Sequence, residues 1–160
     1  MGKVLRSFRN GYPGSISRAV DDVVISMRSV AEGNIPFGAP VFLAAGQNAC
    51  TGFDASTSTP EAFLGFAVRV GDKTPDTYGS NEGAFLPGDP VDILVRGSTV
   101  LSFEGAAAVG NSVYIRKSDA KIVTSAGAAG TTVQLPNVTV RTPRDSGRCA
   151  EVVLTKRNLM

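Results

Sequence analysis

The sequence predicts an all-β fold, a small β-barrel or β-sandwich of about eight short strands that follows an extended N-terminal arm. Runs of strand-forming residues recur at close intervals, and clusters of turn residues separate them. Glycine and proline together supply 27 of the 160 residues, more than in an average globular chain but fewer than in a low-complexity one. A chain of this length buries roughly 70% of its unfolded surface as one domain, without a disulfide or a metal.

We place the arm at residues 1–18 and a single β domain at residues 19–160. The arm contains three glycines, a proline and four basic residues, and its hydrophobic residues show no clear period. The next run, AVDDVVISMRSVAEGN, fits either a short helix or a strand. We favour a strand because β-branched residues dominate from Val23 to Met27 and no apolar face continues past Val30.

Strands and loops then alternate up to residue 90. We expect a turn and a strand at 35–45, a polar loop at 46–60 and a further strand at 61–72. The segment 71–90 contains four glycines and three prolines, a composition typical of a long surface loop.

Two hairpins are predicted in the next part of the chain. The first spans 91–105, with a tight turn at Gly97-Ser98. The second spans 112–126, and alternation along its strands predicts one shared apolar face. That face consists of Val113, Ile115 and Ile122.

The C-terminal part supplies the closing strands. The sequence AGAAG at 126–130 indicates a flexible loop, and strand-forming runs follow at 131–142 and 148–158. Many short strands joined by turns indicate a barrel or a sandwich.

A short frame occurs three times at predicted strand starts: a glycine, one spacer, then proline or serine, then valine. Proline lacks a backbone N–H and therefore belongs at the first residue of a strand. Glycine supplies the backbone freedom for a sharp turn just before it. We interpret the frame as a structural corner rather than a binding site. Its copies lie at 38–41, 88–91 and 110–113.

Charge is distributed unevenly along the chain. Residues 1–18 carry four basic residues and no acid (+4), residues 19–140 carry seven basic and twelve acidic residues (−5), and residues 141–160 carry five basic and two acidic ones (+3). Basic ends on an acidic body favour contact with an acidic partner, protein or nucleic acid. The alternative is that the terminal basic residues only aid solubility.

The sequence offers little for catalysis. It contains no histidine, the commonest general base and transition-metal ligand. Cys50 and Cys149 cannot form a zinc site by themselves, and they are either free thiols or one bridge between distant strands. Asp89 and the pair Ser118 and Lys121 occupy predicted turns, so we interpret them as turn residues. We therefore predict a non-enzymatic protein with no cofactor and no metal, and without an apolar run of membrane-spanning length.

Several motifs, taken in order, resemble those of the tailed-phage head decoration proteins, also called structural cement proteins. They cover about residues 14–125 and include an Ile-x-Phe-Gly-x-x-Val corner and a Pro-Gly-Asp-Pro-Val strand start. The resemblance implies a β-barrel or β-sandwich that binds the outer surface of the major capsid protein lattice and stabilises the phage head. The motifs are Ser17-Arg18, 35–41, 63–69, 87–91 and 110–114.

The resemblance also implies partners and a location. Copies of the chain would associate on the exterior of the virion as a homotrimer or, alternatively, a dimer, without direct nucleic acid or membrane contact. The arm would add a strand to an exposed sheet edge of a neighbour. As residues in contact with the capsid or with other copies we expect Lys3, Arg6, Arg9, Tyr12, Ser17, Arg18, Tyr78 and Phe85.

A second hypothesis is a ligand-binding or carbohydrate-binding β-barrel module of a virion. The loops at 46–60 and 71–90 would form the mouth of its binding site. The chain has no tryptophan to stack on a sugar, and only Tyr12, Tyr78 and Tyr114 could take that role.

Overall fold

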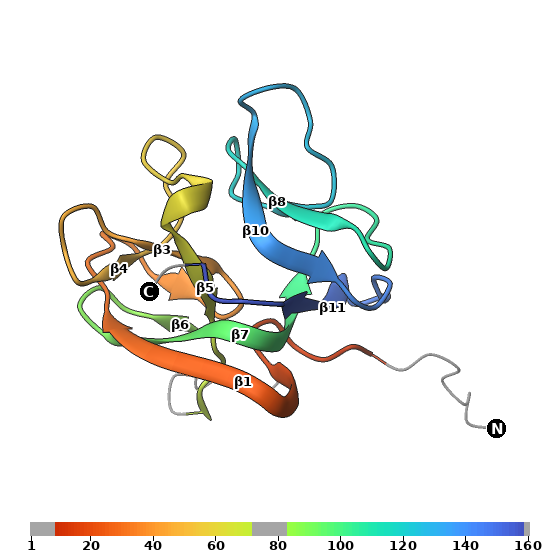
Figure 1. Cartoon of the computed structure of the whole chain (residues 1–160), viewed down its shortest axis with the longest axis horizontal. Helices are drawn as coiled ribbons and strands as arrows, with labels where there is room; N and C mark the ends of the chain where they lie inside the picture. Colours follow the sequence, from red (N-terminus) through yellow and green to blue (C-terminus); the bar gives the residue numbers. More distant parts are fainter. Residues whose placement is uncertain (1–8, 72–82, 159–160) are drawn as a thin grey trace.

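The computed structural model describes residues 9–71 and 83–158 and shows an all-β chain (Figure 1). The predicted fold class is confirmed: apart from one 3-10 turn at Pro60–Ala62, the regular elements of the described residues are strands. The strands are β1 (Ile16–Arg28), β2 (Ile35–Pro36), β3 (Pro40–Leu43), β4 (Cys50–Thr51), β5 (Phe63–Ala67), β6 (Ala84–Phe85), β7 (Pro90–Ser102), β8 (Ser112–Arg116), β9 (Ile122–Val123), β10 (Thr132–Val140) and β11 (Cys149–Leu154).

Strand β7 organises the main sheet. It is 13 residues long and pairs with β1 along one edge. On the other edge, β5 pairs with residues 93–94 and β11 with residues 97–102. Beyond β5 the sheet continues through β3 and β4, and beyond β11 it continues through β10, β8 and β9. Together with β1 and β7, nine antiparallel strands form one sheet. Strands β2 and β6 form a second, two-stranded sheet.

The main sheet curls into a half-barrel with two separate hydrophobic cores (Figure 1). One core unites both branches of the sheet, for example Phe42 of β3 with Ile115 of β8, and therefore lies inside the curl. The other joins β7 to the small sheet and to β1, and contains Ile93 and Phe85. Side chains enter the two cores alternately because successive residues of a strand point to opposite faces.

The structure confirms a strand, β1, where we favoured a strand over a helix. This strand begins before the domain boundary that we expected at residue 18. It starts at Ile16, and the backbone before it is already attached to β7. Gly14 N–H donates to the carbonyl oxygen of Val100 at 2.9 Å, and Val100 N–H donates to that of Ser15 at 3.0 Å. The boundary expected at residue 18 thus falls inside β1.

The three predicted corners are confirmed. Strands β3, β7 and β8 begin at Pro40, Pro90 and Ser112. The glycine two residues before each start has a positive φ, which glycine adopts without a side-chain clash. The φ angles are 75° at Gly38, 87° at Gly88 and 87° at Gly110.

The hairpin predicted at Gly97-Ser98 is wrong. Strand β7 continues through both residues because both of its edges are paired there. Opposite this point β1 leaves its regular register between Arg18 and Val23, and Asp22 comes to lie against β7. A Cβ at Gly97 would overlap the Asp22 carboxylate and lie 3.0 Å from the Asp22 Cα. The glycine marks a close approach of two strands and not a turn.

The second hairpin and the closing strands are confirmed. Strands β8 and β9 pair, and Val113, Ile115 and Ile122 all enter the core inside the curl. The closing strands are β10 and β11, which pair with each other.

The two loops predicted in the first half contain short elements. The polar loop at 46–60 includes β4, which pairs with β3, and ends at the 3-10 turn. Of the segment 71–90, residues 72–82 lie outside the described residues. The rest contains β6, which pairs with β2.

Candidate functional site

Residues 9–18, which we call the strap, lie against the β domain. Asn10 anchors the strap near its first residue. Its backbone N–H donates to Asp145 Oδ2 at 2.7 Å, and its side-chain amide donates to the carbonyl oxygens of Pro143 at 3.0 Å and Cys149 at 2.8 Å. These bonds join the strap to the loop that precedes β11.

The carboxylate of Asp145 is held by backbone donors. Partial burial raises its pKa, but hydrogen bonds from the N–H groups of Asn10, Cys149 and Gly147 and the charge of Arg9 lower it, and the net pKa lies below its usual value. The bonds from Gly147 and Cys149 measure 2.8 and 2.9 Å. The ionised form of Asp145 is therefore the form that holds the strap.

Glu151 is the second anchor of the strap. It lies on β11, and its side chain is only 8% exposed. Ser17 Oγ donates to Glu151 Oε1 at 3.0 Å, and Arg18 Nε donates to the same oxygen at 2.7 Å. Because β7 lies between β1 and β11, these two side chains reach across one strand. The hydrogen bond and the charge of Glu151 raise the pKa of Arg18.

Tyr12 lies between the two anchors. The Arg69 guanidinium lies 5.5 Å from the Tyr12 ring centre and 5.4 Å from that of Phe37. Arg69 N–H also donates to the carbonyl oxygen of Gly14 at 2.8 Å. A cation close to two rings favours a fixed position for them, although 44% of Tyr12 remains exposed.

The structure brings four of the eight predicted contact residues together. Arg9, Tyr12, Ser17 and Arg18 all belong to the strap, and all four are exposed. Phe85 is only 1% exposed and packs edge to face against Phe37, so it is not available to another chain. The other three, Lys3, Arg6 and Tyr78, lie outside the described residues.

Sequence reasoning missed the residues that hold the strap. Asn10, Asp145, Glu151 and Arg69 were not among the predicted site residues. Glu151 does carry a recognisable signal, because an acid within the apolar strand CAEVVL implies a polar partner. The contact between Asn10 and Asp145 joins residues that are 135 positions apart, and no local sequence pattern predicts it.

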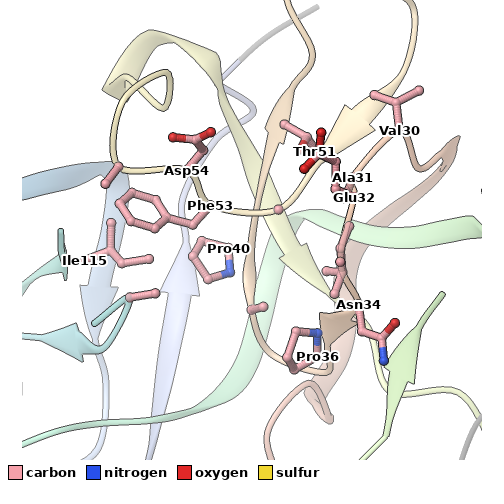
Figure 2. A pocket seen from close by; sticks show the side chains of 16 residues that line it. Val30, Ala31, Glu32, Asn34, Pro36, Pro40, Thr51, Phe53, Asp54 and Ile115 are labelled. Carbon is pink, nitrogen blue, oxygen red and sulfur yellow. The ribbon is translucent and has the colours of Figure 1, made fainter. Parts of the chain in front are cut away.

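A surface cavity of about 630 Å³ is the feature closest to a ligand site (Figure 2). Its walls come from the segments 30–36 and 51–55 and from Ile115 of β8. Part of the loop that we expected to form a mouth, 46–60, thus lines it. Its described lining contains the carboxylates Glu32 and Asp54 and the aromatic ring of Phe53, but neither tyrosine nor tryptophan.

The residues singled out for chemistry have structural roles. Asp89 accepts a hydrogen bond from Leu86 N–H at 2.9 Å, which closes the turn before β7. Cys50 and Cys149 are free and buried, and burial raises the pKa of Cys50 to about 11. Among the described residues, no group of three or more Cys, Asp or Glu side chains could hold a metal ion. No described helix is long and apolar enough to cross a membrane.

A comparison with known protein families identifies one family. The family described as "Structural cement protein (E217 gp24/Pam3 gp6)" matches residues 3–155. A chain in "The capsid of Myoviridae Phage XM1" has a similar fold, with a TM-score of 0.71 over 96% of each chain and 20% sequence identity. The curated proteins contain no match. Since the family match spans nearly the whole sequence, the chain belongs to the phage structural cement protein family and is a non-enzymatic component of the phage capsid.

Proposed function

We propose that the protein binds the outer surface of the major capsid protein lattice and stabilises the shell through its strap and the residues that precede it. Membership of the cement family supports a capsid partner. The observation that carries the proposal is the anchored strap. Asn10 and Arg18 hold it on the β domain, while Arg9 and Tyr12 stay exposed on its surface.

Residues 1–8 precede the strap in the sequence. They contribute two basic residues, Lys3 and Arg6, and no acid. We assign to them the role of an arm that adds a strand to an exposed sheet edge of a neighbouring capsid subunit, where backbone hydrogen bonds supply affinity. Many identical weak contacts over a shell sum to a strong reinforcement.

Contacts between copies form the second part of the proposal. Copies associate in the shell, as a homotrimer or alternatively as a dimer, and Tyr78 stays among the proposed contact residues. Phe85 does not, because it is buried in the core next to β7. Sedimentation velocity of the purified protein distinguishes monomer, dimer and trimer directly.

Truncation of the arm tests the proposal. Deletion of residues 2–8 stops before Asn10, so the anchors of the strap remain. We expect the truncated protein to bind purified heads that lack it at clearly lower occupancy than the full chain, with an unchanged Tm. Equal occupancy would refute the role of the arm.

A charge reversal in the strap provides an independent test. Arg9→Glu should lower head occupancy, because Arg9 is exposed and directly follows residues 1–8 in the sequence. Lys156→Glu is the matched control, since Lys156 is equally basic and exposed but follows the last strand. Equal loss of binding in both variants would indicate a general charge effect and not a contact of the strap.

A further inference from the structure

Strand β1 has a backbone edge that the described chain leaves unpaired. Ser29 N–H donates to the carbonyl oxygen of Asp89 on the β7 side at 2.8 Å, and the register pairs Ile25 with Ile93. Because backbone groups alternate in direction along a strand, Val24 and Ser26 point their N–H and C=O groups away from β7. No hydrogen bond joins these outward groups to another described residue.

The free edge is short and has defined limits. At its end Val30 N–H donates to the carbonyl oxygen of Cys50 at 2.9 Å, so β4 closes the edge beyond Arg28. At its start, the register of β1 against β7 shifts between Val23 and Val24 and again before Val23. The parallel bridge between Ser29 and Cys50 also uses the carbonyl group of Arg28, so the free stretch is 24–27. An exposed strand edge of this kind is a template for a further strand.

Side chains on both faces of β1 remain partly exposed to solvent. On the core face, Val23, Ile25 and Met27 pack against the core next to β7 but stay only partly buried. On the opposite face, Val24 is 41% exposed. A further strand beside β1 would cover apolar surface on both faces, which favours association.

We propose that this edge pairs with the same edge of a second copy, in an antiparallel ladder centred on Ile25. A two-fold axis through Ile25 places Val24 opposite Ser26 of the second copy, so all their outward N–H and C=O groups find partners. The same register pairs Ile25 with itself and Val23 with Met27 on the core face. The segment VVISM, residues 23–27, is thus complementary to itself in hydrogen bonding and packing.

This contact selects a two-fold association and goes beyond the proposed function. A two-fold contact of this kind uses one surface patch on both copies. It involves neither the strap nor the arm, so head binding and pairing through β1 can fail independently.

A cysteine at the axis captures the contact even if it is weak. In the proposed ladder Ile25 faces itself in a non-hydrogen-bonded pair, with Cα atoms about 4.5 Å apart, inside the range that a disulfide spans. Ile25→Cys should form a covalent dimer on mild oxidation. Val24→Cys is the matched control, because Val24 faces Ser26 and the two new thiols lie offset along the ladder. Absence of the dimer in Ile25→Cys, or equal yield in both variants, overturns the proposal.

A proline at the edge supplies the second test. Val24→Pro removes one outward N–H and leaves the hydrogen bonds to β7 intact, as edge strands tolerate. The wild-type protein should sediment as a concentration-dependent dimer, and Val24→Pro should raise the dissociation constant roughly tenfold or more at an unchanged Tm. A wild-type monomer at all concentrations, or a trimer that Val24→Pro does not alter, contradicts the pairing. If Val24→Pro fails to fold, the cysteine experiment decides.

Discussion

At the residue scale, two carboxylates hold the strap in place, and only one of them could have been found from sequence. Glu151 interrupts an apolar strand, and a buried acid needs a hydrogen-bonding partner. Asp145 lies in the loop before β11, in a stretch whose sequence indicates only a turn. Its partner Asn10 comes from the other end of the chain, and a single sequence does not show that these ends meet.

Acid should loosen the attachment at Asp145. The pKa of Asp145 is lowered in the folded protein, so the unfolded chain, whose aspartates have a pKa of about 3.9, takes up this proton first as the pH falls. The stabilising contribution is complete above that value and is lost as the pH drops through the lower pKa of the folded state. We expect Asp145→Asn to lose less free energy of unfolding between pH 7 and pH 3 than the wild type, as measured by urea denaturation.

A matched variant controls for the general effect of acid. Glu32→Gln removes an exposed carboxylate on the cavity rim, and its acid sensitivity should equal that of the wild type. If Asp145→Asn also loses as much stability as the wild type, the ionised Asp145 does not hold the strap.

At the element scale, β7 determines the architecture because four neighbouring segments meet it: β1 and residues 14–15 of the strap on one edge, and β5 and β11 on the other. This strand is where prediction failed. Glycine followed by serine is a common turn signal, and the chain on each side has the length of an ordinary strand. Only the tertiary pairing on both edges keeps the backbone extended through Gly97.

The corner frames show the opposite case, in which local chemistry determines structure. Proline without an N–H and glycine with positive φ have the same consequence in almost any context. All three frames therefore became strand starts at the predicted residues.

Substitution of Gly97 tests the close approach of β1 to β7. Gly97→Ala should lower the free energy of unfolding by about 1–3 kcal/mol, because the new Cβ overlaps the Asp22 carboxylate and the φ of 123° disfavours a side chain. Urea denaturation measures the difference. Gly33→Ala is the control, since no atom lies within 4 Å of a Cβ at that position, and its stability should change by less than about 0.5 kcal/mol. Equal stability of the two variants would contradict the close approach.

At the scale of the whole molecule, the fold class and the non-enzymatic character could be predicted from the sequence. Strand-forming runs and corner glycines predicted the β architecture, and the order of weak motifs indicated the cement family that the family match then showed. The curl of the sheet and its division into two cores were not predictable, since they depend on which distant strands meet β7.

The same scale explains why the protein suits a structural role. Its described residues form a body with two packed cores, and basic residues are concentrated at both ends of the chain. The strap follows residues 1–8 in the sequence, and Asn10 and Arg18 bond it to the loop before β11 and to β11 itself. A cement that resists pressure needs such a continuous connection between its contacts and its core.

The central claim is that the strap side of the β domain faces the outer surface of the capsid lattice. A cryo-electron microscopy map of heads that carry the protein tests it most directly. We expect density for the half-barrel on the outside of the shell, with Arg9 and Tyr12 at the boundary with capsid subunits. Density on the inner surface, or an outer position in which the strap faces solvent, would contradict it.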